Sequence, residues 1–110
     1  MIFQRILVAV DGAPISAHAA DIAAELVQLE GAEMAFVHVI DAELVNAADT
    51  GIQPDVFAAS AKEDARKLID DFRKRLPQQV AALDFVPIGA AHTEIVNAAK
   101  DWPADLIVIG

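Results

Sequence analysis

The chain has 110 residues, of which 55% are hydrophobic and only 5% aromatic, and its formal net charge is -9. This length allows one domain, and the hydrophobic content excludes a disordered chain. The negative charge disfavours nucleic acid and anionic membranes as partners, and the absence of cysteine excludes disulfides, thiolate metal sites and a cysteine nucleophile.

No secretory signal is visible, because the apolar run over residues 6–10 is short and ends at Asp11. No segment approaches the ~20 apolar residues of a membrane span. We therefore expect a soluble, cytoplasmic protein.

The first third of the chain predicts a strand, a helix and a second strand. Residues 6–10 are continuously apolar, as in a parallel strand buried on both faces. Pro14 and Ser16 offer a helix start, and Gly31 suits the left-handed cap at its end. Residues 34–40 form the second strand. The buried stripe of the helix is predicted from its spacing of four, three, four and three to be Ile15, Ala19, Ile22, Leu26 and Leu29.

The middle of the chain predicts a loop, a long helix and a third strand. Residues 41–53 have polar breaks and are expected to form a loop, after which a helix runs from Pro54 to Pro77. Residues 83–88 form the third strand, and Pro87 is expected to place it at a sheet edge because proline cannot donate a ladder hydrogen bond. The buried stripe of the long helix is predicted to be Phe57, Ala61, Ala65, Leu68, Phe72 and Leu76.

The last part predicts a third helix and a fourth strand. The helix covers about residues 93–101, with Ile95, Val96 and Ala99 facing inward, and residues 102–103 end it. Residues 106–109 are apolar throughout, so this strand is expected to be central. The alternation of strands and helices predicts an α/β fold with a doubly wound parallel sheet, right-handed crossovers and the strand order 3-2-1-4.

The topology alone locates a candidate site. Ligands of open α/β sheets bind beyond the carboxyl ends of the strands, where the winding direction reverses, here between strands one and four. Asp11 and Gly110 follow those two ends, and Val39 lies near the end of strand two. Asp11 could contact a ribose hydroxyl, a metal or a phosphoryl group, or equally cap the following helix or loop. Gly110 could open a phosphate-binding loop or form a simple turn.

The remaining candidates carry weaker signals. His18, His38 and His92 fall on a helix, a strand and a loop without metal-ligand spacing, so a metal site is disfavoured. His38 fits a hydrogen-bonded core histidine better than a ligand, and Ser16 fits a helix cap better than a nucleophile. Asp105 opens a strand and is expected to face solvent or cap a turn. The sequence shows no phosphate-binding glycine motif and no catalytic constellation.

Four segments in order resemble the universal stress protein family. Residues 5–12, followed by Pro14 and Ser16, resemble its opening strand and turn, and residues 37–41 resemble its second strand. Gly89 and the residues after it resemble the approach to the third helix, and residues 104–110 resemble the fourth strand. Together these matches cover essentially the whole chain.

The resemblance implies a fold of the adenine nucleotide alpha hydrolase type, with a fifth strand beyond Gly110 and a homodimer formed largely through it. Residues 1–110 would then be a single, C-terminally incomplete domain. In the ATP-binding branch of the family, the end of the first strand and the aspartate after it contact the nucleotide, and these positions match Ala9, Val10 and Asp11. The residue after the histidine of the second strand, which matches Val39, contacts adenine through its backbone. The motif G-x2-G-x9-G-S/T would begin at Gly110. The implied ATP-binding residues are Ala9, Val10, Asp11, Val39, Ile109 and Gly110.

The chain departs from the family pattern at two points. The glycine motif after Gly110, which separates binders from non-binders, is not part of the sequence, and Ala91 stands where many members carry proline. Two functions therefore stay open. One is a stress-response module that binds ATP, with or without Mg²⁺. The other is a member that binds no nucleotide and acts through dimerisation and protein partners.

Enzymatic alternatives find less support. Related folds that cleave ATP carry an S-G-G-x-D-S loop, which residues 11–14 do not match, so we expect at most slow ATP hydrolysis. A phosphoacceptor receiver domain is rejected, because Asp11 has no second acidic residue beside it and Gly89 stands where that fold needs an aspartate.

Overall fold

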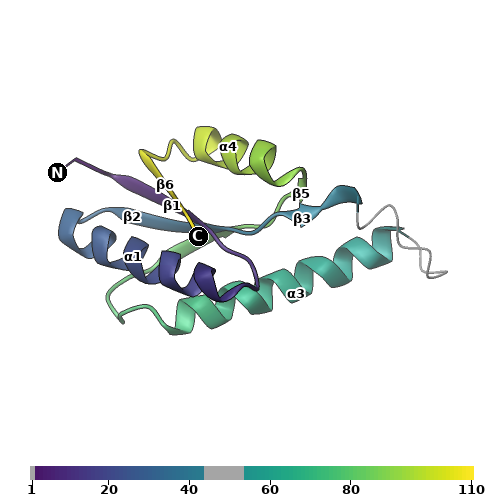
Figure 1. The fold of residues 1–110 in the computed structure, drawn as a ribbon, viewed down its shortest axis with the longest axis horizontal. Coiled ribbons are helices and arrows are strands. Elements are labelled where there is room, and N and C mark those ends of the chain that lie inside the picture. Colours follow the sequence, from purple (N-terminus) through teal and green to yellow (C-terminus); the bar gives the residue numbers. More distant parts are fainter. Residues whose placement is uncertain (1, 44–53) are drawn as a thin grey trace.

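The computed structural model describes residues 2–43 and 54–110 and shows helices covering both faces of a parallel sheet (Figure 1). The helices are α1 (Pro14–Glu30), α3 (Pro54–Lys74) and α4 (Ala91–Asp101). The strands are β1 (Arg5–Ala9), β2 (Glu33–Val37), β3 (Ile40–Asp41), β4 (Ala82–Phe85), β5 (Ile88–Gly89) and β6 (Leu106–Ile109). Residues 44–53 of the expected loop lie outside the described residues. None of the described helices is both long and apolar enough to cross a bilayer.

The main sheet has four parallel strands in the order β4-β2-β1-β6, which confirms the predicted order 3-2-1-4. β1 lies between β2 and β6, with Ile6 opposite Met34 on one side and Leu106 on the other. β6 was expected to be central. Within the described residues it instead forms an edge of the sheet.

Pro87 interrupts the sheet. The Phe85 carbonyl accepts a hydrogen bond from the His38 N–H at 3.0 Å, and the Pro87 carbonyl accepts one from the Ile40 N–H at 2.9 Å. The backbone polar groups of Phe85 and Pro87 therefore point toward the neighbouring strand. The nitrogen of Pro87, which carries no hydrogen, points the same way and cannot donate a hydrogen bond to that strand. The strand does lie at an edge, as predicted, but the proline acts on its inner side. At Pro87 the pairing between the expected strands 34–40 and 83–88 is interrupted, so that each is divided in two and β3 and β5 form a separate two-stranded sheet.

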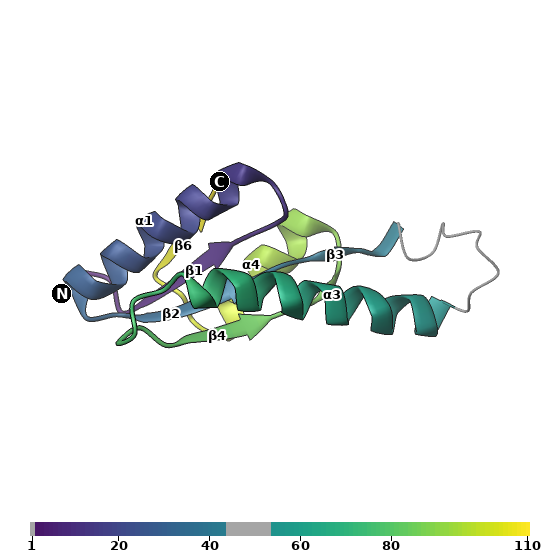
Figure 2. The ribbon, with the colours of Figure 1, turned by 90° about the horizontal axis from the view of Figure 1, so that it is seen from below.

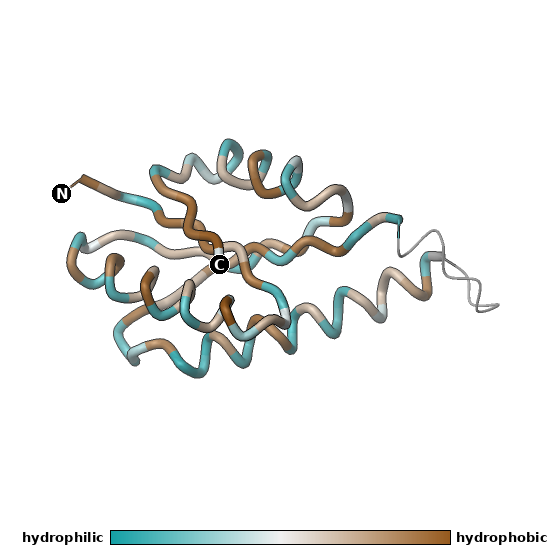
Figure 3. The backbone as a smooth tube through the Cα atoms, in the orientation of Figure 1, coloured by the Kyte–Doolittle hydropathy of each residue, from teal (hydrophilic) through white to brown (hydrophobic). Residues whose placement is uncertain are grey.

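Side chains alternate along the strands and build a core on each face. The larger core joins Ile6, Val8 and Phe36 to α1 and α3, with the rings of Phe36 and Phe72 6.0 Å apart. The smaller core joins Leu7 and Val37 to α4. Figure 3 shows the strands as the most continuously hydrophobic segments, enclosed between the helices.

Helix α3 follows the prediction closely. Ala65 and Phe72 of its predicted stripe are buried, and so is Ile69, which the prediction omitted. Its N-terminal half runs along β3 past the end of the main sheet (Figure 2) and forms a small third core with Ile40. In α4 the prediction is right for Ile95 and Ala99 but wrong for Val96, which is exposed.

The predicted stripe of α1 is wrong for three of its five residues, because the buried face of the helix is rotated, and it is right for Ala19, which is buried, and for Leu26, which packs against the core. Ile15 is 53% exposed and Leu29 is 82% exposed, and Ile22 is exposed as well. The buried face consists of small side chains, which let the helix axis approach the sheet closely. Its members are Ser16, Ala19, Ala20, Ala23, Ala24 and Val27. The C-terminal cap is as predicted, because Gly31 has the left-handed φ of 64°.

Asp105 ties the start of β6 to the start of β1. Its Oδ2 accepts hydrogen bonds from the backbone N–H groups of Gln4 at 2.7 Å and Arg5 at 2.9 Å. These two bonds hold the pKa of the Asp105 carboxyl below its ordinary value of 3.8. Asp105 is exposed to solvent, as the sequence predicts, and its side chain in addition joins two strands that are far apart in the sequence.

Enlarging the alanine face of α1 should destabilise the fold. We expect Ala23→Leu to lower the free energy of unfolding by about 1–3 kcal/mol, because the extra atoms meet a closely packed sheet. Leu29→Ala removes a large apolar side chain from the exposed face, and at protein concentrations low enough for the chain to be monomeric it should change the free energy of unfolding by less than about 0.5 kcal/mol. Urea unfolding of both variants gives the comparison. If Leu29→Ala destabilised the protein more than Ala23→Leu, the helix face predicted from the sequence, which includes Leu29, would be the buried one.

Asp105→Asn should alter the response of stability to acid. A carboxyl whose pKa is lower in the folded state adds stability above its unfolded pKa, and this is lost as the pH falls through the folded pKa. We expect Asp105→Asn to be less stable than the wild type at pH 7 and to lose less stability below about pH 4. Urea unfolding as a function of pH measures this, with Glu25→Gln on the exposed face of α1 as the charge-matched control. Parallel curves for wild type and Asp105→Asn would contradict the role of Asp105.

Candidate functional site

The carboxyl ends of β1, β2 and β6 surround a cavity of about 290 Å³ at the point where the winding reverses. α4 starts beside it and supplies Ala91 and Ile95. All six residues implied by the resemblance line this one cavity: Ala9, Val10, Asp11, Val39, Ile109 and Gly110. A second hollow of about 470 Å³ shares Val39 and Ala91 with it and continues beside β3 and β5.

Asp11 and Ser16 form a closed pair of hydrogen bonds at the end of β1. The Ser16 hydroxyl accepts from the Asp11 N–H at 2.9 Å and donates to Asp11 Oδ1 at 2.8 Å. Asp11 Oδ1 also accepts from the Ala13 N–H at 2.8 Å, which closes a tight turn before α1. The N-terminal cap of α1 is Ala13, without a side-chain hydrogen bond, so Ser16 does not cap the helix as predicted.

The hydrogen bonds from Ala13 and Ser16, and to a smaller extent the nearby His38, hold the pKa of the Asp11 carboxyl below its ordinary value of 3.8. Asp11 therefore carries a negative charge at neutral pH. Both bonds use Oδ1, and no hydrogen bond within the described residues engages Oδ2. One carboxylate oxygen thus fixes the turn while the other remains available at the cavity.

Gly110 is required by packing. A Cβ atom at this position would lie 2.7 Å from the carbonyl oxygen of Ile15, so the end of β6 touches the first turn of α1. A Cβ atom at Gly12 would meet nothing within 4 Å. The glycine thus lets the backbone of β6 reach α1 and form one wall of the cavity.

His38 lies between β2 and β3 and is half-buried at the cavity. Its Nδ1 lies 2.8 Å from the carbonyl oxygen of Val10, so the imidazole is hydrogen-bonded, as the sequence suggests, although it borders the site and not only the core. Val39 follows it, and no hydrogen bond within the described residues engages the backbone N–H or C=O of Val39.

The structure adds lining residues that the sequence did not assign to the site: Ser16, Val37, His38, Ala91 and Ile95. Val37 lies inside the second strand as predicted, residues 34–40, so only the end of β2 at Val37 in the structure places it at the cavity. Ala91 and Ile95 could have been found from the topology, because the third helix must begin beside the switch point. This helix starts earlier than predicted, at Ala91, and so includes His92, which was assigned to a loop.

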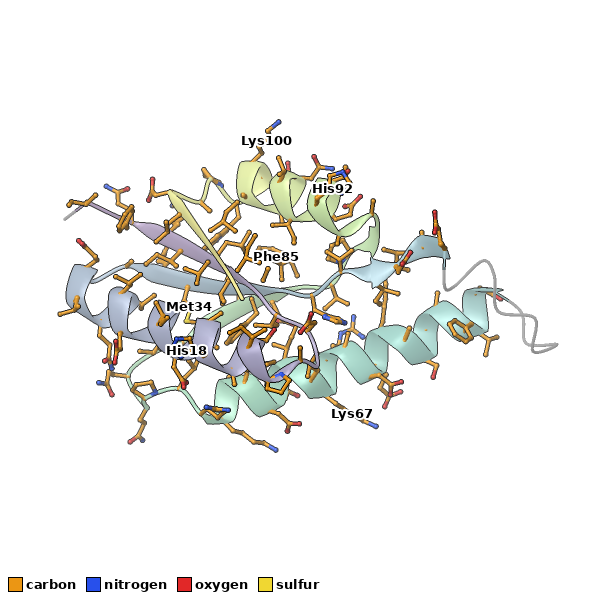
Figure 4. The ribbon with its side chains drawn as sticks, viewed as in Figure 1. His18, Met34, Lys67, Phe85, His92 and Lys100 are labelled. Carbon is orange, nitrogen blue, oxygen red and sulfur yellow. The ribbon has the colours of Figure 1, made fainter. Side chains whose placement is uncertain are left out.

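The cavity lining contains one carboxylate, one imidazole and no lysine or arginine. The basic side chains gather elsewhere, and Lys67 and Lys100 point away from the sheet in Figure 4. Six of the 8 basic residues lie on α3 or directly after it, namely Lys62, Arg66, Lys67, Arg73, Lys74 and Arg75. An anionic ligand in the cavity would therefore rely on backbone N–H groups or on a cation that it brings along.

The histidines do not converge. His18 on α1 and His92 on α4 lie on opposite faces of the sheet (Figure 4). In the part of the chain that the structure describes, no three side chains of the metal-binding types come together.

Comparison with known proteins finds relatives of the same fold. The chain is 31% identical to the universal stress protein YxiE of Bacillus subtilis over 116 residues, which covers 98% of this chain and 78% of that protein. A universal stress family protein from Burkholderia pseudomallei superposes with a TM-score of 0.82 at 28% identity, covering 99% of this chain and 82% of the other. A universal stress protein in complex with cAMP superposes at 0.69 with 18% identity over 100% of this chain and 77% of the other, and at that identity it shows the fold alone.

The family model described as "Universal stress protein family" matches residues 2–110, nearly the whole chain. On this match and the identity to YxiE, the chain belongs to the universal stress protein family.

Proposed function

We propose that this universal stress protein binds an adenine nucleotide, ATP, in the cavity at the ends of β1, β2 and β6. The observation that carries the proposal is the convergence of six residues, matched to the family one by one from the sequence, around a single cavity. These residues lie at or just after the ends of three strands that are far apart in the chain, so the tertiary fold brings them together.

The chemistry of the cavity suits a nucleoside. Ala9, Val37, Ile95 and Ile109 supply apolar walls for a planar base. The unpaired backbone groups of Val39 suit the hydrogen-bonding edge of adenine, and Oδ2 of Asp11 suits a ribose hydroxyl. The volume of about 290 Å³ is at the lower end of the roughly 300–1,000 Å³ usual for small-molecule sites, so the phosphates would extend out of it.

One universal stress protein of this fold has been solved in complex with cAMP, itself an adenine nucleotide, and this ligand is of the class that we propose here. Since no lysine or arginine lines the cavity, we propose that ATP binds together with Mg²⁺, which neutralises part of the phosphate charge. ATP hydrolysis that is at most slow and a cytoplasmic location stay predictions from the sequence.

Calorimetric titration with ATP and Mg²⁺ tests the proposal, with two substitutions of Asp11. Asp11→Asn keeps an oxygen for the Ala13 N–H and removes the charge, whereas Asp11→Ala removes both. We expect both to weaken ATP binding about 10- to 100-fold, because a hydrogen bond to a charged group is worth about 1.5–3 kcal/mol. Both substitutions should lower stability at pH 7, because the pKa of Asp11 is lowered in the folded protein, and Asp11→Ala should lower it more because the turn also loses its acceptor for the Ala13 N–H.

Glu25→Gln, on the exposed face of α1, is the charge-matched control and should bind ATP like the wild type. If Asp11→Asn binds ATP as tightly as the wild type, Asp11 serves only the turn. If the wild type gives no heat with ATP, GTP or cAMP, the alternative function without nucleotide is favoured.

A specific surface supports the homodimer as well. We name as the β6 flank the exposed side chains Ile15, Ile22 and Leu29 of α1, the last 82% exposed. Asp21 bonds Arg75 at the end of α3, so the apolar stripe of α1 lies on the other side of the helix, toward β6. The outer edge of β6 is also unpaired within the described residues. An apolar edge strand of this kind is a template for a further strand, and we propose that a second copy of this protein covers it.

Sedimentation velocity should show a species of twice the chain mass of 11.7 kDa. Ile22→Asp places a charge in the β6 flank and should shift the distribution toward the monomer. Val56→Asp, which changes an exposed apolar residue on α3, is the matched control and should leave the dimer unchanged. A wild type that stays monomeric at high concentration would refute the dimer.

A further inference from the structure

The hydrogen bonds between β1 and β2 follow a strict alternation up to the edge of the cavity. At the start of the ladder the Glu33 N–H donates to the Gln4 carbonyl at 2.8 Å, and at its end the Val10 N–H donates to the Val37 carbonyl at 3.0 Å. The odd-numbered residues of β2 therefore face β1. By the same alternation, the next bond would join the Val39 N–H to the Val10 carbonyl.

That bond is not formed. The Val10 carbonyl is instead bonded to His38 Nδ1 at 2.8 Å, and since a carbonyl oxygen only accepts, Nδ1 carries the hydrogen. The backbone of His38 keeps its place in the sheet, because its N–H donates to the Phe85 carbonyl on the opposite side at 3.0 Å. The imidazole thus donates to the Val10 carbonyl, the oxygen to which the Val39 N–H would have donated if the ladder had continued.

We propose that His38 is a positioning residue that holds the backbone of Val39 open and thereby sets the preference of the site for adenine. This inference rests on the proposed nucleotide function. The N–H and C=O of one strand residue point to the same side and offer one donor and one acceptor. Adenine presents the matching pair, an acceptor at N1 and a donor at N6. Hypoxanthine presents the reverse order, a donor at N1 and an acceptor at O6, so in the orientation that adenine takes it would place donor against donor and acceptor against acceptor at Val39.

The alternative is that His38 only fills the end of the ladder. Two substitutions separate these roles. His38→Ala removes the ring and frees the Val10 carbonyl, so that the Val39 N–H closes onto it. His38→Asn keeps a short side-chain N–H that reaches the same carbonyl and should behave like the wild type. His18→Ala, an exposed residue on α1, is the control for the loss of an imidazole.

The first readout needs no ligand. Amide hydrogen exchange at Val39, followed by NMR, should slow by about 10-fold or more in His38→Ala relative to the wild type, because the amide gains a hydrogen bond. It should stay fast in His38→Asn and His18→Ala. An unchanged exchange rate in His38→Ala, or a slowed rate in His38→Asn, would overturn the proposal.

The second readout is the ratio of the affinities for ATP and ITP, which differ only in the base. The wild type should prefer ATP, and His38→Ala should lose most of that preference, while His38→Asn retains it. If the wild type binds ATP but His38→Ala keeps the same ratio, the inference fails and the nucleotide function stands. If the wild type binds neither nucleotide, the nucleotide function fails, and the adenine preference fails with it.

Discussion

β1 has a strand on each side and a helical layer on each face, and the rest of the structure depends on this position. Its side chains Ile6, Leu7 and Val8 are completely buried, and they divide between the two cores. A strand enclosed in this way has no polar surface until it ends. The first polar groups after it, those of Asp11 and Ser16, are therefore concentrated at one edge of the sheet, and the chain must satisfy them locally. The closed pair of hydrogen bonds between these residues does so and leaves Oδ2 of the carboxylate at the cavity.

The strands and their order could be predicted because buried parallel strands are apolar on both faces and crossovers have one hand. The orientation of α1 could not, because spacing arguments give weight to isoleucine and leucine. Ala20, Ala23 and Ala24 pack against the sheet because they are small, and a hydrophobic pattern that ranks them below Ile22 chooses the wrong face. Val96 is misplaced for the same reason, since α4 also packs through Ala98 and Ala99.

The candidate site was predictable to the extent that it follows strand ends. Asp11, Val39 and Gly110 lie where the topology puts the reversal, and the resemblance adds their neighbours. The bond between His38 and Val10 was not predictable, because it depends on how far β1 and β2 diverge and on the direction of one ring. Pro87 was correctly predicted to lie in an edge strand, but its nitrogen faces the neighbouring strand and not the open edge of the sheet. A sequence shows that a residue cannot donate a hydrogen bond, but the register of the sheet decides which neighbour is left without one.

The excess of acidic side chains near the cavity has a kinetic consequence. Asp11 lines the cavity, and Asp41 and Glu43 line the hollow beside it, whereas the basic side chains of α3 are matched in number by the acidic side chains of the same helix. A nucleotide approaching this end meets a field of its own sign. Added salt screens that field, so the association rate constant of an anionic ligand should rise with ionic strength, the reverse of electrostatic steering. Such a site would fill slowly from dilute solution, and its occupancy would follow sustained levels of the nucleotide instead of brief changes.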